Sequence, residues 1–200
     1  MPPTTSWDER YAGADYMYGT EPNEFLRRHA GLIPDGPVLC LGEGEGRNAV
    51  HLAGLGHAVT AVDQSAVGMA KARKLAAAKG VILETLVADL AEFEIRPGHW
   101  AGIVSIFCHL PPALRGQVMG AAAAGLRAGG VLLLEGYTVE QLKYRTGGPS
   151  MPELMVSAAD LRRELAGLRF QRAEELVRPV REGALHNGDA AVVQVVAIRD

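Results

Sequence analysis

The sequence predicts an α/β fold with a doubly wound, mostly parallel sheet of seven strands that ends in an antiparallel C-terminal strand. From residue 38 to residue 135, short apolar runs alternate with longer stretches of helical period, which is the pattern of parallel strands joined by helices. The chain then ends in two apolar runs separated by a turn sequence, which is typical of an antiparallel pair. A glycine-rich loop follows the first strand, as it does in Rossmann-like sheets.

Seven apolar runs supply the predicted strands. The parallel strands are Val38–Leu41, Ala58–Val62, Val81–Val87, Ile103–Cys108 and Val131–Glu135. The antiparallel pair is Phe170–Val180 and Ala190–Ile198, joined by a turn at His186–Asn187–Gly188.

Helices are predicted between the strands, where apolar residues recur every three or four positions. Gly56 and Gly80 directly follow two of these stretches, as helix-ending glycines do. A Ser-x-x-Asp capping pattern starts the last helix at Ser157. The predicted helices are residues 25–32, Arg47–Leu55, Val67–Lys79, Pro111–Arg127 and a final helix from Ser157 to Leu168.

The length suits one α/β domain, so residues 1–200 are expected to form a single domain. Residues 1–34, with Trp7, Tyr11 and two further tyrosines, are expected to form an N-terminal cap segment. Residues 141–154 contain glycine and proline and have no clear period, which predicts a surface lid loop over the site.

Composition and charge exclude several classes of protein. The net charge of −3 and a pI near 6.1 disfavour nucleic acid as a partner, since such binders carry a basic stripe. No apolar run has the length of a membrane span, and the N-terminus lacks a secretion signal, so a cytoplasmic protein is expected. The two cysteines, Cys40 and Cys108, lie in apolar runs and show no metal-ligand spacing, which predicts buried reduced thiols and no metal site. The sequence leaves the oligomeric state open.

The candidate site lies just after the strands, because open parallel sheets bind ligands at the carboxyl ends of their strands. A loop with Gly42, Gly44 and Gly46 follows the first strand and opens a helix whose amide groups can face an anion. Asp63 ends the second strand, 21 residues after Gly42, where such folds hold ribose hydroxyls. Asp89 follows the third strand and is placed to read an adenine amino group. Together these residues predict a ligand that contains adenosine.

Two other nucleotide-binding classes fit less well. A dinucleotide site needs a third glycine three residues after Gly44, and this chain has the bulky Arg47 there. A nicotinamide oxidoreductase is therefore disfavoured. The lysine–serine pair of nucleoside triphosphatases is also missing from the loop.

These motifs resemble those of class I S-adenosylmethionine-dependent methyltransferases. VLCLGEGEGRNAVHLAGLGHAVTAVDQS is similar to their first two motifs, LVADLAEF to the third, GIVSIFCHLPP occupies the fourth, and LRAGGVLLLEGY is similar to the strand-five region. WDERYAGADYMYGTEPNEFL and EGYTVEQLKYRTGGPSMPEL further resemble the tellurite-resistance branch, which is akin to thiopurine methyltransferases. The resemblance implies a Rossmann-like fold, S-adenosylmethionine as cofactor, and methyl transfer to a small-molecule acceptor, for which a thiol and a selenium or tellurium species are the candidates.

The resemblance also implies residue roles. Gly42, Gly44 and Gly46, with Glu43 between them, would surround the methionyl end of the cofactor. Asp63 would hold the ribose beside Gln64 and Ser65, and Asp89 with the Leu90 amide would read the adenine. Phe107 and Cys108 would lie near the sulfonium, while Trp7 and Tyr11 would close the pocket. The implied cofactor-binding residues are Trp7, Tyr11, Gly42, Glu43, Gly44, Gly46, Asp63, Gln64, Ser65, Asp89, Leu90, Phe107 and Cys108.

The candidates for catalysis near the transferred methyl are His109, Tyr137 and Tyr11. Each has a plainer alternative: His109 as a strand-end histidine bonded to backbone, and Tyr137 as an aromatic at the edge of the core. A soft sulfur, selenium or tellurium nucleophile needs little help from a base. The sequence after the fourth strand lacks the Asp/Asn-Pro-Pro-aromatic motif of nucleic-acid amino methylases, which disfavours base methylation.

Cys40 departs from the family, which usually has an acid two residues before the first glycine. Either Glu43 or Glu45 could compensate, or either could simply face water. The departure also leaves open a second hypothesis, a non-catalytic or sensory domain that binds the cofactor without turnover.

Overall fold

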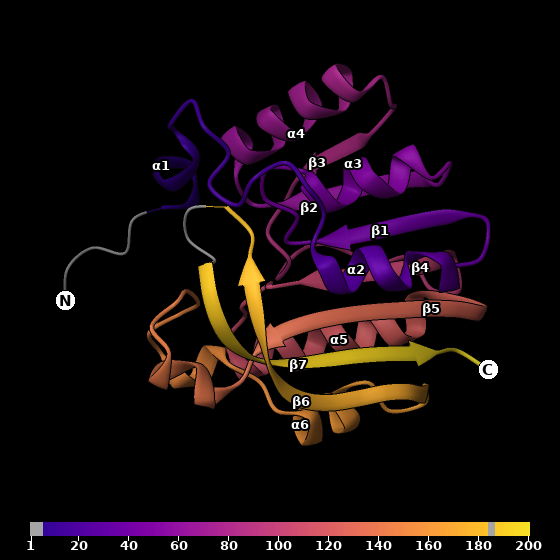
Figure 1. Cartoon of the computed structure of the whole chain (residues 1–200). Coiled ribbons are helices and arrows are strands. Elements are labelled where there is room, and N and C mark those ends of the chain that lie inside the picture. Colours follow the sequence, from indigo (N-terminus) through magenta and orange to yellow (C-terminus); the bar gives the residue numbers. More distant parts are fainter. Residues whose placement is uncertain (1–5, 184–186) are drawn as a thin grey trace.

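The computed structural model describes residues 6–183 and 187–200, which form one seven-stranded sheet with helices on both faces (Figure 1). The strand order is β3-β2-β1-β4-β5-β7-β6, and β7 runs antiparallel to both of its neighbours. The predicted fold class, including the antiparallel C-terminal strand, is therefore confirmed. The strands are β1 (Pro37–Leu41), β2 (Ala58–Asp63), β3 (Glu84–Val87), β4 (Trp100–Ile106), β5 (Leu126–Tyr137), β6 (Arg169–Arg181) and β7 (Asn187–Ile198).

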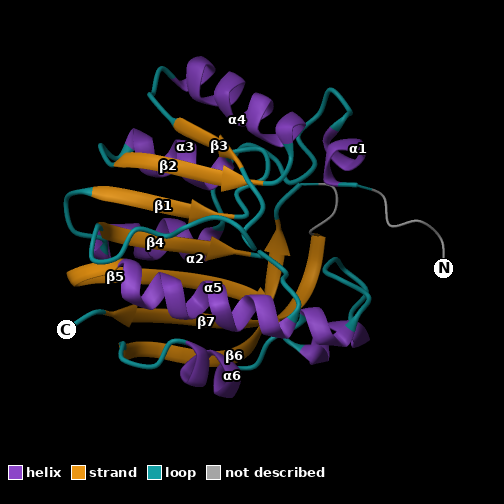
Figure 2. Ribbon diagram, turned by 180° about the vertical axis from the view of Figure 1, so that it is seen from behind, coloured by secondary structure: helices purple, strands orange, loops and turns teal. Residues whose placement is uncertain are grey.

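Two layers of helices cover the sheet (Figure 2). Helices α2, α3 and α4 pack on one face, and α5 and α6 pack on the other. The α-helices are α1 (Trp7–Tyr11), α2 (Glu24–His29), α3 (Arg47–Gly54), α4 (Ala66–Lys79), α5 (Pro112–Gly125) and α6 (Ala158–Glu164). Short 3-10 turns follow at Ala30–Leu32, Val139–Lys143 and Pro152–Leu154.

Alternation along each strand divides the core between the two faces. On β1, Val38 and Cys40 pack toward α3 and α4, whereas Leu39 and Leu41 pack toward α5. All four side chains are at most 1% exposed. Because both faces are covered, the central strands are continuous apolar runs, which is why the sequence revealed them clearly.

Strand β4 begins and ends earlier than its apolar run predicts. It spans Trp100–Ile106, so Phe107 and Cys108 lie in the loop beyond it and not at its end. Phe107 has a φ of 52°, a left-handed conformation that costs energy for a side chain of this size. Its amide still donates to the Glu135 carbonyl at 2.7 Å, which holds the chain at the sheet while it turns. Such backbone strain concentrates at functional sites.

Strand β5 is longer than predicted, because Gly129 and Gly130 lie inside it and do not precede it. The Gly129 amide donates to Arg199, and Gly130 accepts from the Arg199 amide, so tertiary pairing with the chain end extends the strand. Strand β3 is shorter than predicted, since the Val81 amide donates a hydrogen bond to the Ala76 carbonyl at the end of α4.

The C-terminal hairpin is also longer than predicted. Asn187 pairs with Arg181 and therefore belongs to β7. His186, which was expected in the turn, lies outside the described residues.

The N-terminal segment divides into two parts with different positions. Helix α1 lies beside the start of α4, at the carboxyl end of the sheet (Figure 1). Helix α2 instead packs in the core through Phe25 and Leu26, which are 2% and 0% exposed. The expected cap of residues 1–34 is therefore too long, because Phe25 and Leu26 are covered by the sheet face. Among the described residues, no helix combines the length and apolarity that crossing a membrane requires.

Candidate active site

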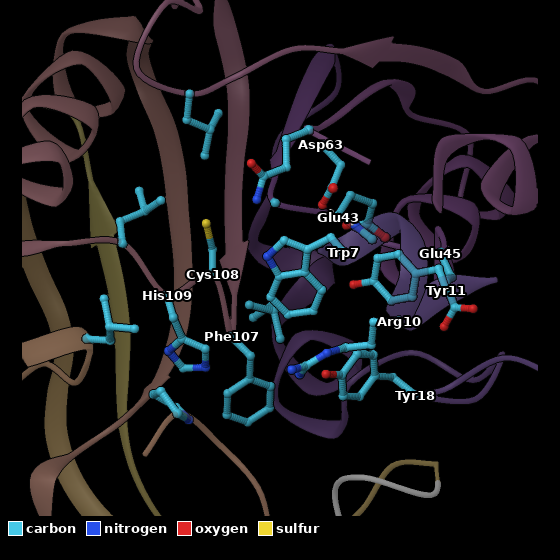
Figure 3. Close-up of a pocket in the computed structure, with 18 of the residues that line it drawn as sticks. Trp7, Arg10, Tyr11, Tyr18, Glu43, Glu45, Asp63, Phe107, Cys108 and His109 are labelled. Atoms are coloured by element: carbon cyan, nitrogen blue, oxygen red, sulfur yellow. Dashed lines mark hydrogen bonds between the residues drawn. The ribbon is translucent and has the colours of Figure 1, made fainter. Parts of the chain in front are cut away.

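A cavity of about 640 Å³ opens at the carboxyl ends of β1, β2 and β4 (Figure 3). This is the point where the strand order reverses, because the chain passes from β1 outward to β3 and then returns to the other side at β4. The loops after neighbouring strands diverge there and leave a crevice. Its walls come from α1, the glycine loop, the segment after β4, and residues 148–151 and 154.

The glycine loop allows close approach of two other parts of the chain. A Cβ atom on Gly44 would lie 2.7 Å from the Tyr11 hydroxyl oxygen, and one on Gly46 would lie 2.6 Å from the Ala72 Cβ of α4. Both glycines have positive φ. Gly44 lines the cavity, whereas Gly46 does not, so the predicted cofactor contact of Gly46 is not supported. Its role is to let α3 and α4 pack closely.

Glu43 caps helix α3 from within the loop. Its Oε1 accepts the amides of Asn48 at 2.9 Å and Ala49 at 2.8 Å. Gly46, at the N-cap, has no side chain to do this, so the carboxylate supplies the missing cap. Glu43 thus orders the loop beside Cys40, whose thiol pKa is raised by burial first and then by the nearby carboxylate.

The buried Glu43 carboxylate should make folding stability depend on pH. Burial raises the pKa of Glu43 to about 7, despite the two amides and Arg47. The folded state then takes up this proton at a higher pH than the unfolded state does, so the contribution to stability increases as pH falls from about 7 to 4.5. The free energy of unfolding of Glu43→Gln, measured relative to that of wild type, should therefore rise by up to about 3 kcal/mol from pH 5 to pH 8. Urea unfolding of both proteins at the two pH values measures this, and an equal difference at both would contradict it.

Asp63 lies at the end of β2 and joins the glycine loop to the start of α4. Its Oδ2 accepts the Gly44 amide and its Oδ1 accepts the Ser65 amide, each at 2.8 Å. The residue is 8% exposed, and burial raises the pKa of its carboxyl group. An ionised carboxylate has about four acceptor positions, so two remain for a ligand in the cavity.

The segment that contains α1 is fastened over the cavity by polar contacts. Asp8 accepts the Ser65 hydroxyl at 2.5 Å and the Val67 amide at 3.1 Å, at the start of α4. Glu45 accepts the Met17 amide at 2.8 Å and pairs with Lys71 at 2.7 Å. Glu45 is only 4% exposed, so the alternative that it faces water is wrong. These contacts place Trp7 and Tyr11 in the wall of the cavity, stacked 5.5 Å apart.

The segment after β4 supplies Phe107, Cys108 and His109 to the opposite wall (Figure 3). Burial raises the pKa of Cys108 to about 12, so its thiol stays protonated at neutral pH. Burial also lowers the pKa of His109 to about 4, against an opposing hydrogen bond with the Leu154 backbone. The imidazole is therefore neutral at physiological pH.

The neutral state of His109 can be measured directly. We expect its imidazole nitrogen signals in two-dimensional NMR to titrate with a midpoint near pH 4, because burial penalises the charged ring. The His109→Gln variant identifies the signal by its loss. A midpoint near the ordinary value of about 6.5 would contradict the buried environment.

Two further expected site residues lie outside the cavity lining. Tyr137 is fully buried and stacks on Phe107 at 4.6 Å and on His109 at 5.5 Å, so it supports the wall from behind and does not reach the cavity. Ser65 is 1% exposed and is occupied in capping α4 through the Gly68 amide. Tyr137 and Ser65 are therefore corrected from catalytic and cofactor-binding residues, respectively, to structural residues.

The remaining predicted residues all line the cavity. They are Trp7, Tyr11, Gly42, Glu43, Gly44, Asp63, Gln64, Asp89, Leu90, Phe107, Cys108 and His109. Asp89 is exposed, and its Oδ1 accepts the Ala91 amide at 2.9 Å, which shapes the loop after β3. Burial raises the pKa of Tyr11, so its phenol stays protonated and cannot serve as a base at neutral pH.

Several lining residues were not predicted from the sequence, above all Arg10, Tyr18, Arg47 and Met151. Arg10 had a usable signal, because it lies three residues after Trp7 and such spacing places side chains on one helix face. Arg47 is held by residues far away in the sequence, with its guanidinium 2.7 Å from Glu182. No local pattern reveals that pairing.

Arg47 belongs to a buried cluster of ion pairs behind the cavity. Arg178 pairs with Glu135 at 2.6 Å and with Glu182 at 3.1 Å. Asn23, at the start of α2, donates to both carboxylates, at 2.6 Å and 3.0 Å. Burial alone raises the pKa of Glu182, but the two arginines outweigh it and the pKa lies below its ordinary value. The cluster joins the starts of α2 and α3 to β5 and to the end of β6.

The comparisons with known proteins agree with this geometry. Residues 38–130 match the model of a methyltransferase domain family. No curated protein sequence matches the chain.

Three solved structures show the same fold. One, reported for the conversion of a disulfide bond into a thioacetal group during echinomycin biosynthesis, is 22% identical with a TM-score of 0.76, covering 96% of this chain and 88% of its own. TehB from Haemophilus influenzae is 18% identical with a TM-score of 0.70, covering 88% of this chain and 61% of its own. Magnesium protoporphyrin IX methyltransferase from Synechocystis, with bound SAH, is 19% identical with a TM-score of 0.63, covering 88% and 78%. Residues 38–130 thus match a methyltransferase domain, and the chain as a whole has the fold of S-adenosylmethionine-dependent methyltransferases.

Proposed function

We propose that this protein is an S-adenosylmethionine-dependent methyltransferase that acts on a small-molecule acceptor, a thiol or a selenium or tellurium species. The observation that carries the proposal is the cavity at the switch point of the sheet, where the glycine loop, Asp63 and Asp89 line one continuous space. The match of residues 38–130 to a methyltransferase domain supports it.

The residues present fit the proposed cofactor. Gly44 has no Cβ, so the loop backbone can lie directly against a ligand beside Tyr11. The Asp63 carboxylate suits a pair of ribose hydroxyls. The carboxyl groups of Glu43 and Asp63 line the cavity, and in their ionised form they favour the sulfonium and ammonium groups of S-adenosylmethionine. The aromatic rings of Trp7 and Tyr11 add a favourable surface for a cation.

The chain's own residues would align the reactants and exclude water. Bound S-adenosylmethionine supplies an activated methyl group and a neutral leaving group. The strained turn at Phe107 holds the wall after β4 in one position, and Trp7 and Tyr11 cover the space opposite it. Alignment of nucleophile and methyl at about 3–3.5 Å accounts for most of what such a reaction needs. Cys108 stays a neutral thiol and is therefore a poor competing nucleophile.

The shortage of bases in the wall supports the proposed acceptor class. His109 is a weak base because its pKa is about 4, and Tyr11 stays protonated. Oxygen and nitrogen acceptors often need a base, whereas soft chalcogen nucleophiles do not. The resemblance of the sequence to the tellurite-resistance branch also favours a selenium or tellurium species or a thiol.

Calorimetric titration of S-adenosylmethionine, S-adenosylhomocysteine and NADH into the wild-type protein tests the cofactor. We expect dissociation constants in the micromolar range for the first two and no binding of NADH. The acceptor is tested by transfer of labelled methyl to thiols, selenite and tellurite. Binding without transfer to any of them would contradict this acceptor class and favour a non-catalytic cofactor-binding domain. No binding of either adenosyl compound would overturn the proposed function.

A further inference from the structure

Arg10 extends from α1 into the cavity. Its guanidinium carbon lies 4.8 Å from the centre of the Trp7 ring, in a cation–π arrangement. Figure 3 shows the side chain passing between Trp7 and Tyr18 toward Phe107, on the side of the cavity away from Asp63. Stacking on Trp7 fixes the direction of a side chain that would otherwise sample many rotamers.

Arg10 differs from the other charged side chains that line the cavity. Arg47 is paired with Glu182, Glu45 with Lys71, and Glu43 with the amides of α3. Across residues 6–183 and 187–200, no carboxylate forms an ion pair with Arg10. Arg10, which is partly open to solvent, therefore has no ion-pair partner within the described part of the cavity.

The aromatic side chains beside Arg10 carry no charge. Phe107 and Trp7 are neutral, and His109 is neutral because its pKa is about 4. An anion bound there would meet the Arg10 guanidinium beside aromatic side chains. The planar guanidinium can donate two parallel hydrogen bonds to a carboxylate or similar oxyanion.

We propose that Arg10 binds a carboxylate or another oxyanion inside the cavity, at the end away from Asp63. The anion has two chemically equivalent sources if the proposed function holds. One is the carboxylate of the methionyl part of the cofactor, and the other is an anionic group on the methyl acceptor. Arg10 determines cofactor affinity in the first case and acceptor specificity in the second.

Calorimetry with two adenosine compounds tests the first source. S-adenosylhomocysteine carries the amino-acid carboxylate, whereas 5′-methylthioadenosine has the same adenosine and sulfur without it. If the cofactor is the source, Arg10→Gln should lower the affinity for S-adenosylhomocysteine about 10-fold to 100-fold and leave the affinity for 5′-methylthioadenosine unchanged. Arg10→Lys should keep part of the affinity, because the charge remains and the fork is lost.

Anion titration of the protein saturated with S-adenosylhomocysteine tests the second source. The probes are 3-mercaptopropionate, selenite and the neutral 3-mercapto-1-propanol, followed through the Arg10 side-chain Nε–H signal in NMR. If the acceptor is the source, the anions shift this signal and the neutral thiol does not, while Arg10→Gln keeps its affinity for S-adenosylhomocysteine. Arg28→Gln is the matched control, since it removes the same charge from an exposed arginine on α2.

Two results would overturn the proposal. An equal loss of affinity for both adenosine compounds in Arg10→Gln would mean that Arg10 acts only by supporting Trp7. Unchanged affinity for S-adenosylhomocysteine, with no anion shifting the Arg10 signal, would mean that no anion binds there. Failure of the proposed function is distinguishable from both results, because the wild-type protein would then bind neither adenosine compound.

Discussion

Replacing Asp63 with alanine should lower the affinity for S-adenosylhomocysteine by about 100-fold or more. The substitution would remove two hydrogen bonds between the carboxylate and the ribose, each worth about 1.5–3 kcal/mol because the acceptor is charged. It would also leave the Gly44 and Ser65 amides without their acceptor, which loosens the loop that faces the ligand. Calorimetric titration measures the loss directly.

Two comparison variants separate binding from folding in this experiment. Asp63→Asn keeps an oxygen for one of the two amides, so it should fold well and still bind poorly. Asp89→Ala should lower the affinity for S-adenosylhomocysteine by less, because Asp89 is exposed and its Oδ1 already accepts the Ala91 amide. Wild-type affinity in a folded Asp63→Ala protein would show that the cavity binds its ligand elsewhere.

Replacing Arg178 with methionine should lower the free energy of unfolding by about 3–5 kcal/mol, because it leaves two buried carboxylates short of a partner. Glu135 and Glu182 are 1% and 8% exposed, and Arg178 contacts both. A domain typically has only about 5–15 kcal/mol of stability, so this loss would be easily visible in urea unfolding.

Arg169 offers a matched control for this change on the same strand. It pairs with Asp200, but the two side chains are 54% and 69% exposed. Arg169→Met should therefore change stability by less than about 1 kcal/mol. Equal effects of the two substitutions would mean that the buried cluster contributes no more than a surface ion pair.

The sequence predicted the parallel part of the fold well for a physical reason. Strands such as β1 are covered on both faces, so they must be apolar throughout, and each stands out between polar loops. The glycine loop could be recognised equally well, because its glycines and Asp63 lie close together in the sequence. Element ends were less accurate, as β4 and β5 show, since hydrogen bonds to distant segments determine where each strand stops.

The sequence alone determined the fold class, the cavity's position at the carboxyl edge of the sheet, and the glycine-loop and strand-end residues that line it. These properties depend on hydrophobic period and on residues that are neighbours along the chain. Only the tertiary structure decided that Tyr137 lies behind the wall, that Glu43 caps α3, and that Arg10 faces the cavity with no ion-pair partner among the described residues. Burial and ion pairing arise between segments more than a hundred residues apart, as between Arg47 and Glu182, and no local pattern encodes them.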